Sequence, residues 1–135
     1  MISIYNASAG SGKTFTLTLE YIKMLLNDKQ QKDHNSLPHS HILAVTFTKK
    51  ATAEMKERIL KELYIISTTP EKSDYAKEIL KTSGDKWTHE KLKLKAKKLL
   101  TDILQDYSRF SISTIDSFFQ QVIRTFAIDL GLSTT

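Results

Sequence analysis

Cysteine is absent from this sequence of 135 residues, and so is any long hydrophobic run. The lack of cysteine excludes a disulfide scaffold, a thiolate metal site and a cysteine nucleophile, and it fits a reducing cytoplasm. No apolar stretch approaches the roughly 20 residues that a membrane-spanning helix needs. The first residues lack the basic and long apolar stretches of a signal peptide. These absences favour a cytoplasmic protein with no membrane partner.

The composition is that of a globular chain with a basic balance. Its hydrophobic fraction of 40% and charged fraction of 26% separate it from a disordered chain. The 20 Lys+Arg and 15 Asp+Glu residues give a net charge of +5 at pH 7, which favours an anionic partner. Lysines gather in residues 49–61 and 86–98, and basic clusters attract phosphate backbones. For the second cluster, a solvated helix face is the favoured interpretation.

Short β-rich segments alternate with longer helical segments along the chain. The apolar patterns predict strands over residues 2–5, 42–45 and 110–113. Alternation of strands and helices predicts a parallel sheet with helical crossovers, here with three strands. The helices are expected over residues 13–27, 49–66, 72–81, 88–107 and from about 116 to 130.

The final predicted helix has its own start and stop signals. Asp116 or Ser117 is the expected N-cap, and Ser117 with Gln120 fits a capping box. Gly131 is a plausible end of the helix. Phe118 lies on the apolar stripe of this helix, so a place in the core is its favoured role.

A phosphate-binding loop is the strongest chemical signal. Gly10 and Gly12 allow a close backbone approach to an anion, and the following helix start adds N–H donors and positive partial charge. Lys13 would reach the β- and γ-phosphates of ATP, and the Thr14 hydroxyl would ligate Mg²⁺. The loop departs from the general pattern at its first position, which is alanine instead of glycine. The predicted phosphate-binding loop comprises Ala7, Ser8, Ala9, Gly10, Ser11, Gly12, Lys13 and Thr14.

Two further motifs complete a family resemblance. Residues 42–55, centred on Thr46-Phe47-Thr48, resemble motif Ia of UvrD/Rep-type superfamily 1 DNA helicases, and residues 113–118 resemble the next motif, with Asp116 in place of the usual His. The phosphate loop has the alanine start of the same family. The resemblance is strongest to the helicase–nuclease branch that contains AddA and the exonuclease V beta subunit, and it covers residues 6 to about 123.

The resemblance implies a fold and a set of roles. The chain would be the N-terminal part of the first RecA-like domain, an α/β phosphate-loop NTPase fold with a helical insertion at about residues 67–108. Its cofactors would be ATP and Mg²⁺. Its partners would be single-stranded DNA, the remainder of the helicase motor and a second helicase–nuclease subunit. The DNA-facing residues would be Thr46, Phe47, Thr48, Lys50 and Thr114.

Each DNA-facing residue also has a structural interpretation. Phe47 could pack in the core, because aromatic residues at strand ends often point inward. Thr46 and Thr48 could cap the following helix, and Lys50 could be a solvated surface charge. These alternatives stay open at the level of sequence.

Some parts of a complete motor are missing from the sequence. No apolar run ends in an Asp-Glu pair, so the acid that completes Mg²⁺ coordination and activates water is absent, and no arginine finger is identifiable. The chain alone is therefore expected to lack turnover. A small-molecule or nucleotide kinase is an alternative, although an arginine-rich lid and an acceptor-site acid are missing. A non-hydrolysing nucleotide- or nucleic-acid-binding module is another.

Overall fold

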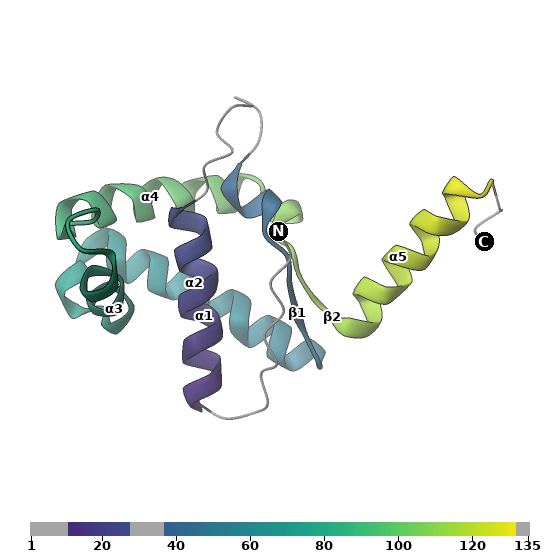
Figure 1. The fold of residues 1–135 in the computed structure, drawn as a ribbon, viewed down its shortest axis with the longest axis horizontal. Coiled ribbons are helices and arrows are strands. Elements are labelled where there is room, and N and C mark those ends of the chain that lie inside the picture. Colours follow the sequence, from purple (N-terminus) through teal and green to yellow (C-terminus); the bar gives the residue numbers. More distant parts are fainter. Residues whose placement is uncertain (1–10, 28–36, 132–135) are drawn as a thin grey trace.

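The computed structural model describes residues 11–27 and 37–131, which form a helical body with a small sheet at its side (Figure 1). None of the helices in these ranges is long and apolar enough to cross a membrane. The elements are α1 (Ser11–Leu26), η1 (Pro38–His41), β1 (Ala44–Thr46), α2 (Lys49–Thr68), η2 (Pro70–Lys72), α3 (Asp74–Ser83), α4 (His89–Gln105), η3 (Tyr107–Arg109), β2 (Ile112–Thr114) and α5 (Ile115–Asp129).

The sheet of the described residues consists of β1 and β2, which pair in parallel. Ala44 lies opposite Ile112 and Thr46 opposite Thr114, and the chain between the strands forms the helical crossover. The predicted strands at 42–45 and 110–113 are thus found, each shifted by one or two residues. The third predicted strand, residues 2–5, lies outside the described residues.

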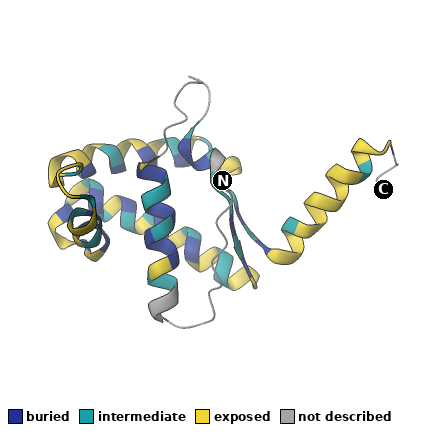
Figure 2. Ribbon diagram, in the orientation of Figure 1, coloured by how far each residue is buried: buried dark blue, intermediate teal, exposed yellow. Residues whose placement is uncertain are grey.

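The core lies between α1, α2, α3 and α4 (Figure 2). Helix α1 is buried on several sides, as its apolar pattern predicts, and α2 and α4 each present one buried stripe at a spacing of three or four residues. The stripe of α2 comprises Met55, Ile59, Leu63 and Ile66, and that of α4 comprises Leu92, Ala96, Leu99 and Ile103.

Hydroxyl side chains begin several of the helices. Thr48 accepts a hydrogen bond from the Ala51 N–H and thereby caps α2. Helix α5 is capped by Thr114, which accepts from the Ser117 N–H at 3.2 Å. The prediction of Asp116 or Ser117 as the cap of α5 is therefore wrong. The chain passes from strand to helix without an intervening loop, so the last strand residue is also the cap.

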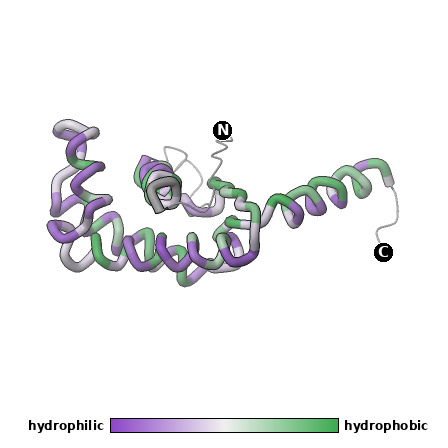
Figure 3. The backbone as a smooth tube through the Cα atoms, turned by 90° about the horizontal axis from the view of Figure 1, so that it is seen from below, coloured by the Kyte–Doolittle hydropathy of each residue, from purple (hydrophilic) through white to green (hydrophobic). Residues whose placement is uncertain are grey.

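Helix α5 projects away from the rest of the structure (Figure 1), and none of its residues is buried. Its hydrophobic residues gather along one side of the helical path (Figure 3). Phe119 and Phe126 are 63% and 64% exposed. Phe118 is half-buried, so within the described residues it does not lie in the core as predicted. Gly131 follows the helix with a φ of 73°, as expected for a terminating glycine.

Candidate nucleotide and DNA site

The described part of the predicted phosphate loop is the start of α1. Residues 7–10 and the side chains of Ser11 and Lys13 lie outside the described structure. The backbone is helical from Ser11 onward, and Thr14 is half-buried in the first turn. A helix start at this place supplies the N–H donors and positive partial charge that a phosphate group needs. The local structure therefore fits the nucleotide site that the motif predicts.

The carboxyl ends of the two strands meet at one edge of the sheet. Thr46 and Thr114 are direct partners in the parallel register. Thr46, the first residue of the segment 46–50, therefore lies beside Thr114. The first turn of α1 lies toward the same end of the molecule (Figure 1). Ligands of open α/β sheets bind outside the carboxyl ends of the strands, so this edge is the candidate site.

Two threonines hold the turn between β1 and α2. Thr46 is 7% exposed, and its Oγ1 lies 2.6 Å from Thr52 Oγ1 and 3.1 Å from the Thr48 carbonyl oxygen. Thr48 is exposed, but its hydroxyl oxygen accepts the capping bond from Ala51 at 3.0 Å. The capping alternative therefore describes Thr48, whereas Thr46 fixes the turn through side-chain contacts.

Phe47 projects from this turn, and Lys50 projects from the first helical turn of α2. Phe47 is 60% exposed, so the alternative of a core position is wrong for the described structure. Lys50 is also exposed and forms no ion pair within the described ranges. A rigid turn and helix start that display one aromatic ring and one ammonium group can offer a stacking surface and a phosphate contact.

Thr114, like Thr46, is buried, unlike the exposed Phe47, Thr48 and Lys50. It is 8% exposed, and its hydroxyl lies 2.9 Å from Ser117 Oγ in addition to accepting from the Ser117 N–H. The side chain is therefore engaged in the cap of α5. Thr114 positions the edge that Phe47 and Lys50 share.

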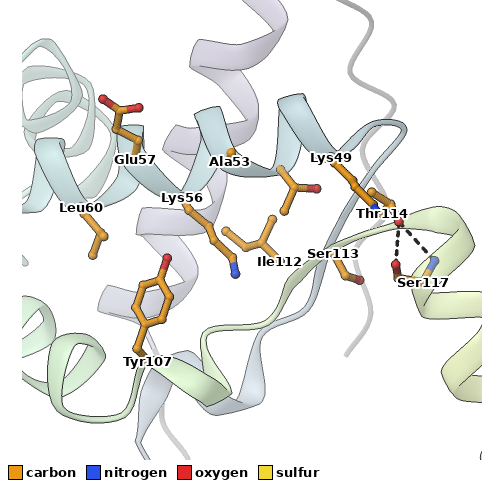
Figure 4. A pocket seen from close by; sticks show the side chains of 11 residues that line it. Lys49, Ala53, Lys56, Glu57, Leu60, Tyr107, Ile112, Ser113, Thr114 and Ser117 are labelled. Carbon is orange, nitrogen blue, oxygen red and sulfur yellow. Dashed lines mark hydrogen bonds between the residues drawn. The ribbon is translucent and has the colours of Figure 1, made fainter.

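A pocket of about 550 Å³ opens beside this edge, between α2 and the segment that leads into β2 (Figure 4). Lys49 and Thr114 line the end near the strand termini, and Lys56 and Tyr107 line the other end. The sequence prediction missed this pocket. The spacing of Lys49, Ala53 and Lys56 along the predicted helix was the available signal, since these positions share one helix face.

Comparison with known proteins assigns the chain to a family. The sequence model of the UvrD/REP helicase N-terminal domain matches residues 3–134. The chain belongs to this family. The match includes the phosphate loop, the β1–α2 turn and the β2–α5 junction, and it implies a RecA-like fold for the UvrD/REP domain, of which the described residues supply two parallel strands and their flanking helices.

Curated proteins similar to this UvrD/REP domain include a helicase/nuclease subunit. The chain is 31% identical over 136 residues to the Gabija protein GajB of Bacillus cereus, a match that covers 87% of this chain and 19% of that protein. It is 32% identical to an ATP-dependent helicase/nuclease subunit of Lactobacillus acidophilus, covering 96% of this chain and 8% of that protein. Identity to the RecBCD enzyme subunit RecB of Haemophilus influenzae is 43% over 58 residues, which cover 43% of this chain and 5% of RecB.

The chain thus spans less than a fifth of the length of these relatives. No solved structure matches it.

Proposed function

We propose that this chain is the ATP-binding portion of an ATP-dependent DNA helicase, in a helicase–nuclease subunit that moves along single-stranded DNA. The observation that carries the proposal is the parallel pairing of Thr46 with Thr114, which joins two motif segments at one sheet edge. One relative, the ATP-dependent helicase/nuclease subunit of Lactobacillus acidophilus, supports the same class by its name.

The nucleotide side of the proposal uses the phosphate loop. The loop backbone of residues 7–12 and the α1 helix start would hold the ATP phosphates, with Lys13 on the β- and γ-phosphates. Thr14, in the first turn of α1, would ligate Mg²⁺ through its hydroxyl. Bound Mg²⁺-ATP supplies the phosphoanhydride whose hydrolysis drives the motor. This chain's own residues bind and orient that nucleotide.

The DNA side of the proposal uses the adjacent strand edge. Phe47 would stack on a base, and Lys50 would meet a backbone phosphate, while Thr46, Thr48 and Thr114 hold the edge in shape. Since the edge lies toward the same end as the start of α1, a change in nucleotide state could alter these contacts. The remainder of a motor and a second helicase–nuclease subunit complete the proposed assembly, in the cytoplasm.

Replacement of Phe47 by alanine tests the DNA side directly. Phe47→Ala should weaken binding of a labelled oligothymidylate by about 1–3 kcal/mol, the usual contribution of one stacked base. The melting temperature should stay unchanged, because the ring is 60% exposed. Tyr64→Ala is the matched control, as Tyr64 is equally exposed at 60% but lies in the far half of α2. Unchanged DNA affinity in a folded Phe47→Ala variant would remove this edge from the DNA path.

A further inference from the structure

We propose that the pocket between α2 and Tyr107 is a second binding subsite for single-stranded DNA. The strand that contacts the Phe47 edge would continue into this pocket. The proposal rests on the proposed function and adds a DNA-binding subsite that the sequence motifs do not predict. Its lining residues are Lys49, Thr52, Ala53, Lys56, Glu57, Leu60, Tyr107, Ile112, Ser113, Thr114 and Ser117.

One face of α2 forms the wall of this pocket. Lys49, Ala53, Lys56 and Leu60 follow one another at intervals of four, three and four residues, so they lie on a single helix face. This face is separate from the buried stripe that packs on α4. The small side chain of Ala53 leaves space between the two lysines. A ligand can therefore lie along the helix surface without displacing core residues.

The spacing of the two lysines matches a nucleic-acid backbone. Seven residues separate Lys49 from Lys56, which corresponds to about 10 Å along a helix axis. Phosphates follow one another at about 3.4 Å of axis per strand in a duplex, so 10 Å corresponds to about three phosphate steps. Both ammonium groups can thus contact phosphates of the same strand.

The charge balance of the pocket favours an anion. Neither Lys49 nor Lys56 forms an ion pair within residues 11–27 and 37–131. Glu57 is the acidic residue of the lining, and it points away from the Lys56 ammonium group (Figure 4). Ser113 Oγ is buried and has no hydrogen-bond partner within the same ranges. Two cations without a carboxylate partner and one unpaired hydroxyl suit a phosphodiester.

Tyr107 supplies a surface for a base at the far end of the pocket. The Lys56 ammonium nitrogen lies 5.3 Å from the centroid of the Tyr107 ring, and the ring meets Phe110 edge to face at 5.9 Å. These contacts hold the ring while it remains 47% exposed. A held, partly exposed aromatic ring is the platform on which an unpaired base stacks, and a base-paired duplex cannot use it in this way.

The pocket is continuous with the proposed DNA edge. Thr114 ends β2 and belongs to both, and Lys49, in the pocket lining, begins α2 directly after Thr48 of the edge. The strand therefore runs from Phe47, across Lys49 and Lys56, to Tyr107. The proposed DNA path therefore lies along α2 and leads away from the carboxyl ends of β1 and β2.

Two variants test the subsite in the full 135-residue chain, with a fluorescein-labelled oligothymidylate as the probe. Tyr107→Leu should weaken binding about five- to a hundredfold through the loss of one stacked base. Lys56→Gln should lower affinity and reduce the slope of log affinity against log salt by about one. Tyr64→Leu and Lys93→Gln are the matched controls, since both residues are exposed and lie outside the pocket. Both controls should bind as the unchanged protein does.

Photocrosslinking provides a measurement that does not depend on variant stability. An oligothymidylate with one 5-iododeoxyuridine should crosslink to Tyr107 in the unchanged protein, at a position distinct from the one that crosslinks to Phe47. If Tyr107→Leu and Lys56→Gln bind normally, or crosslinks form at Phe47 alone, the subsite is overturned and the proposed function stands. If the unchanged chain does not bind the oligonucleotide, both proposals fail.

A free nucleotide also carries phosphates and a base, so it could occupy the same pocket. Competition with Mg-ATP distinguishes a free nucleotide from single-stranded DNA as the ligand. If ATP binds only at the phosphate loop, added Mg-ATP should not reduce the oligonucleotide crosslink at Tyr107 in the Lys13→Ala variant. If ATP competes with the crosslink in Lys13→Ala but not in Lys56→Gln, the pocket takes free nucleotide, and the proposal of a DNA subsite is wrong.

Discussion

Neighbouring residues at the β1–α2 turn differ in that some stabilise the turn and one is exposed for binding. Thr46 is buried and bonded to Thr52, and Thr48 caps the helix, while Phe47 between them is exposed. Substitution of Thr46 should therefore act on the structure of the turn, whereas substitution of Phe47 should act on what the turn binds. The same three-residue motif combines a scaffold and a contact surface.

His39 joins two distant parts of the chain. Its ring is fully buried, and Nε2 lies 2.9 Å from the Asp106 carboxylate and 3.1 Å from the Asp106 carbonyl oxygen. The Arg109 guanidinium donates to the same carboxylate at 2.8 Å. The Arg109 hydrogen bond is the main reason that the pKa of Asp106 lies below its usual value. This cluster links η1 to the end of α4.

The lowered pKa of Asp106 predicts a pH-dependent stability. An acid with a depressed folded-state pKa stabilises the fold above its unfolded pKa of about 3.9, and this contribution is lost as the pH falls through the folded-state pKa. The difference in melting temperature between the unchanged protein and Asp106→Asn should therefore be largest at neutral pH and should shrink below about pH 4.

Thermal unfolding between pH 7 and pH 3 measures this difference. Asp129→Asn is the control, because Asp129 is exposed and forms no ion pair within the described residues. A difference for Asp106→Asn that does not change over this pH range would contradict the prediction.

Helices α4 and α5 are both amphipathic, but only α4 buries its apolar side. Leu99→Ala in α4 should lower the free energy of unfolding by about 2–5 kcal/mol, because the side chain is fully buried. Phe126→Ala in α5 should change it by about 0.5 kcal/mol or less, since this ring is 64% exposed. Denaturant titration of both variants measures the contrast. A loss of several kcal/mol in Phe126→Ala would mean that another surface covers α5 in solution.

Local patterns predicted the helices well, because a helix depends on contacts three and four residues apart. The stripe of α2 and its Thr48 cap illustrate this. The meeting of the strand ends was also predictable, because parallel strands align their carboxyl ends. The contact of His39 with Asp106 was not, as it joins residues 67 positions apart. Tyr107 falls within the predicted helix over residues 88–107, but the helix ends at Gln105 and the ring lies beside the Lys56 ammonium group.

At the scale of the whole molecule, the described elements would form one side of the proposed nucleotide site. The start of α1 and the ends of β1 and β2 face one end of the molecule (Figure 1). The sequence has no Asp-Glu pair after an apolar run. The proposed function therefore assigns this chain residues that bind nucleotide and does not assign it the acid that activates water.

The pure 135-residue chain should bind ATP without turning it over at a motor's rate. An arginine finger alone is worth roughly 10³-fold or more in phosphoryl transfer, and the acid that completes Mg²⁺ coordination is missing as well. A steady-state phosphate-release assay with and without oligothymidylate checks this. Turnover of many ATP molecules per second would contradict it and would require a catalytic acid elsewhere in the chain.

Calorimetric titration of Mg-ATP into the unchanged protein and Lys13→Ala tests the central assignment most directly. The Lys13 ammonium group should contribute a charge-assisted hydrogen bond to the phosphates, so its loss should weaken binding by about 1.5–3 kcal/mol. Lys93→Ala, which removes an exposed lysine from α4, should bind as tightly as the unchanged protein. Equal affinity of the unchanged protein and a folded Lys13→Ala variant would contradict the assignment of this chain as the ATP-binding part of a helicase.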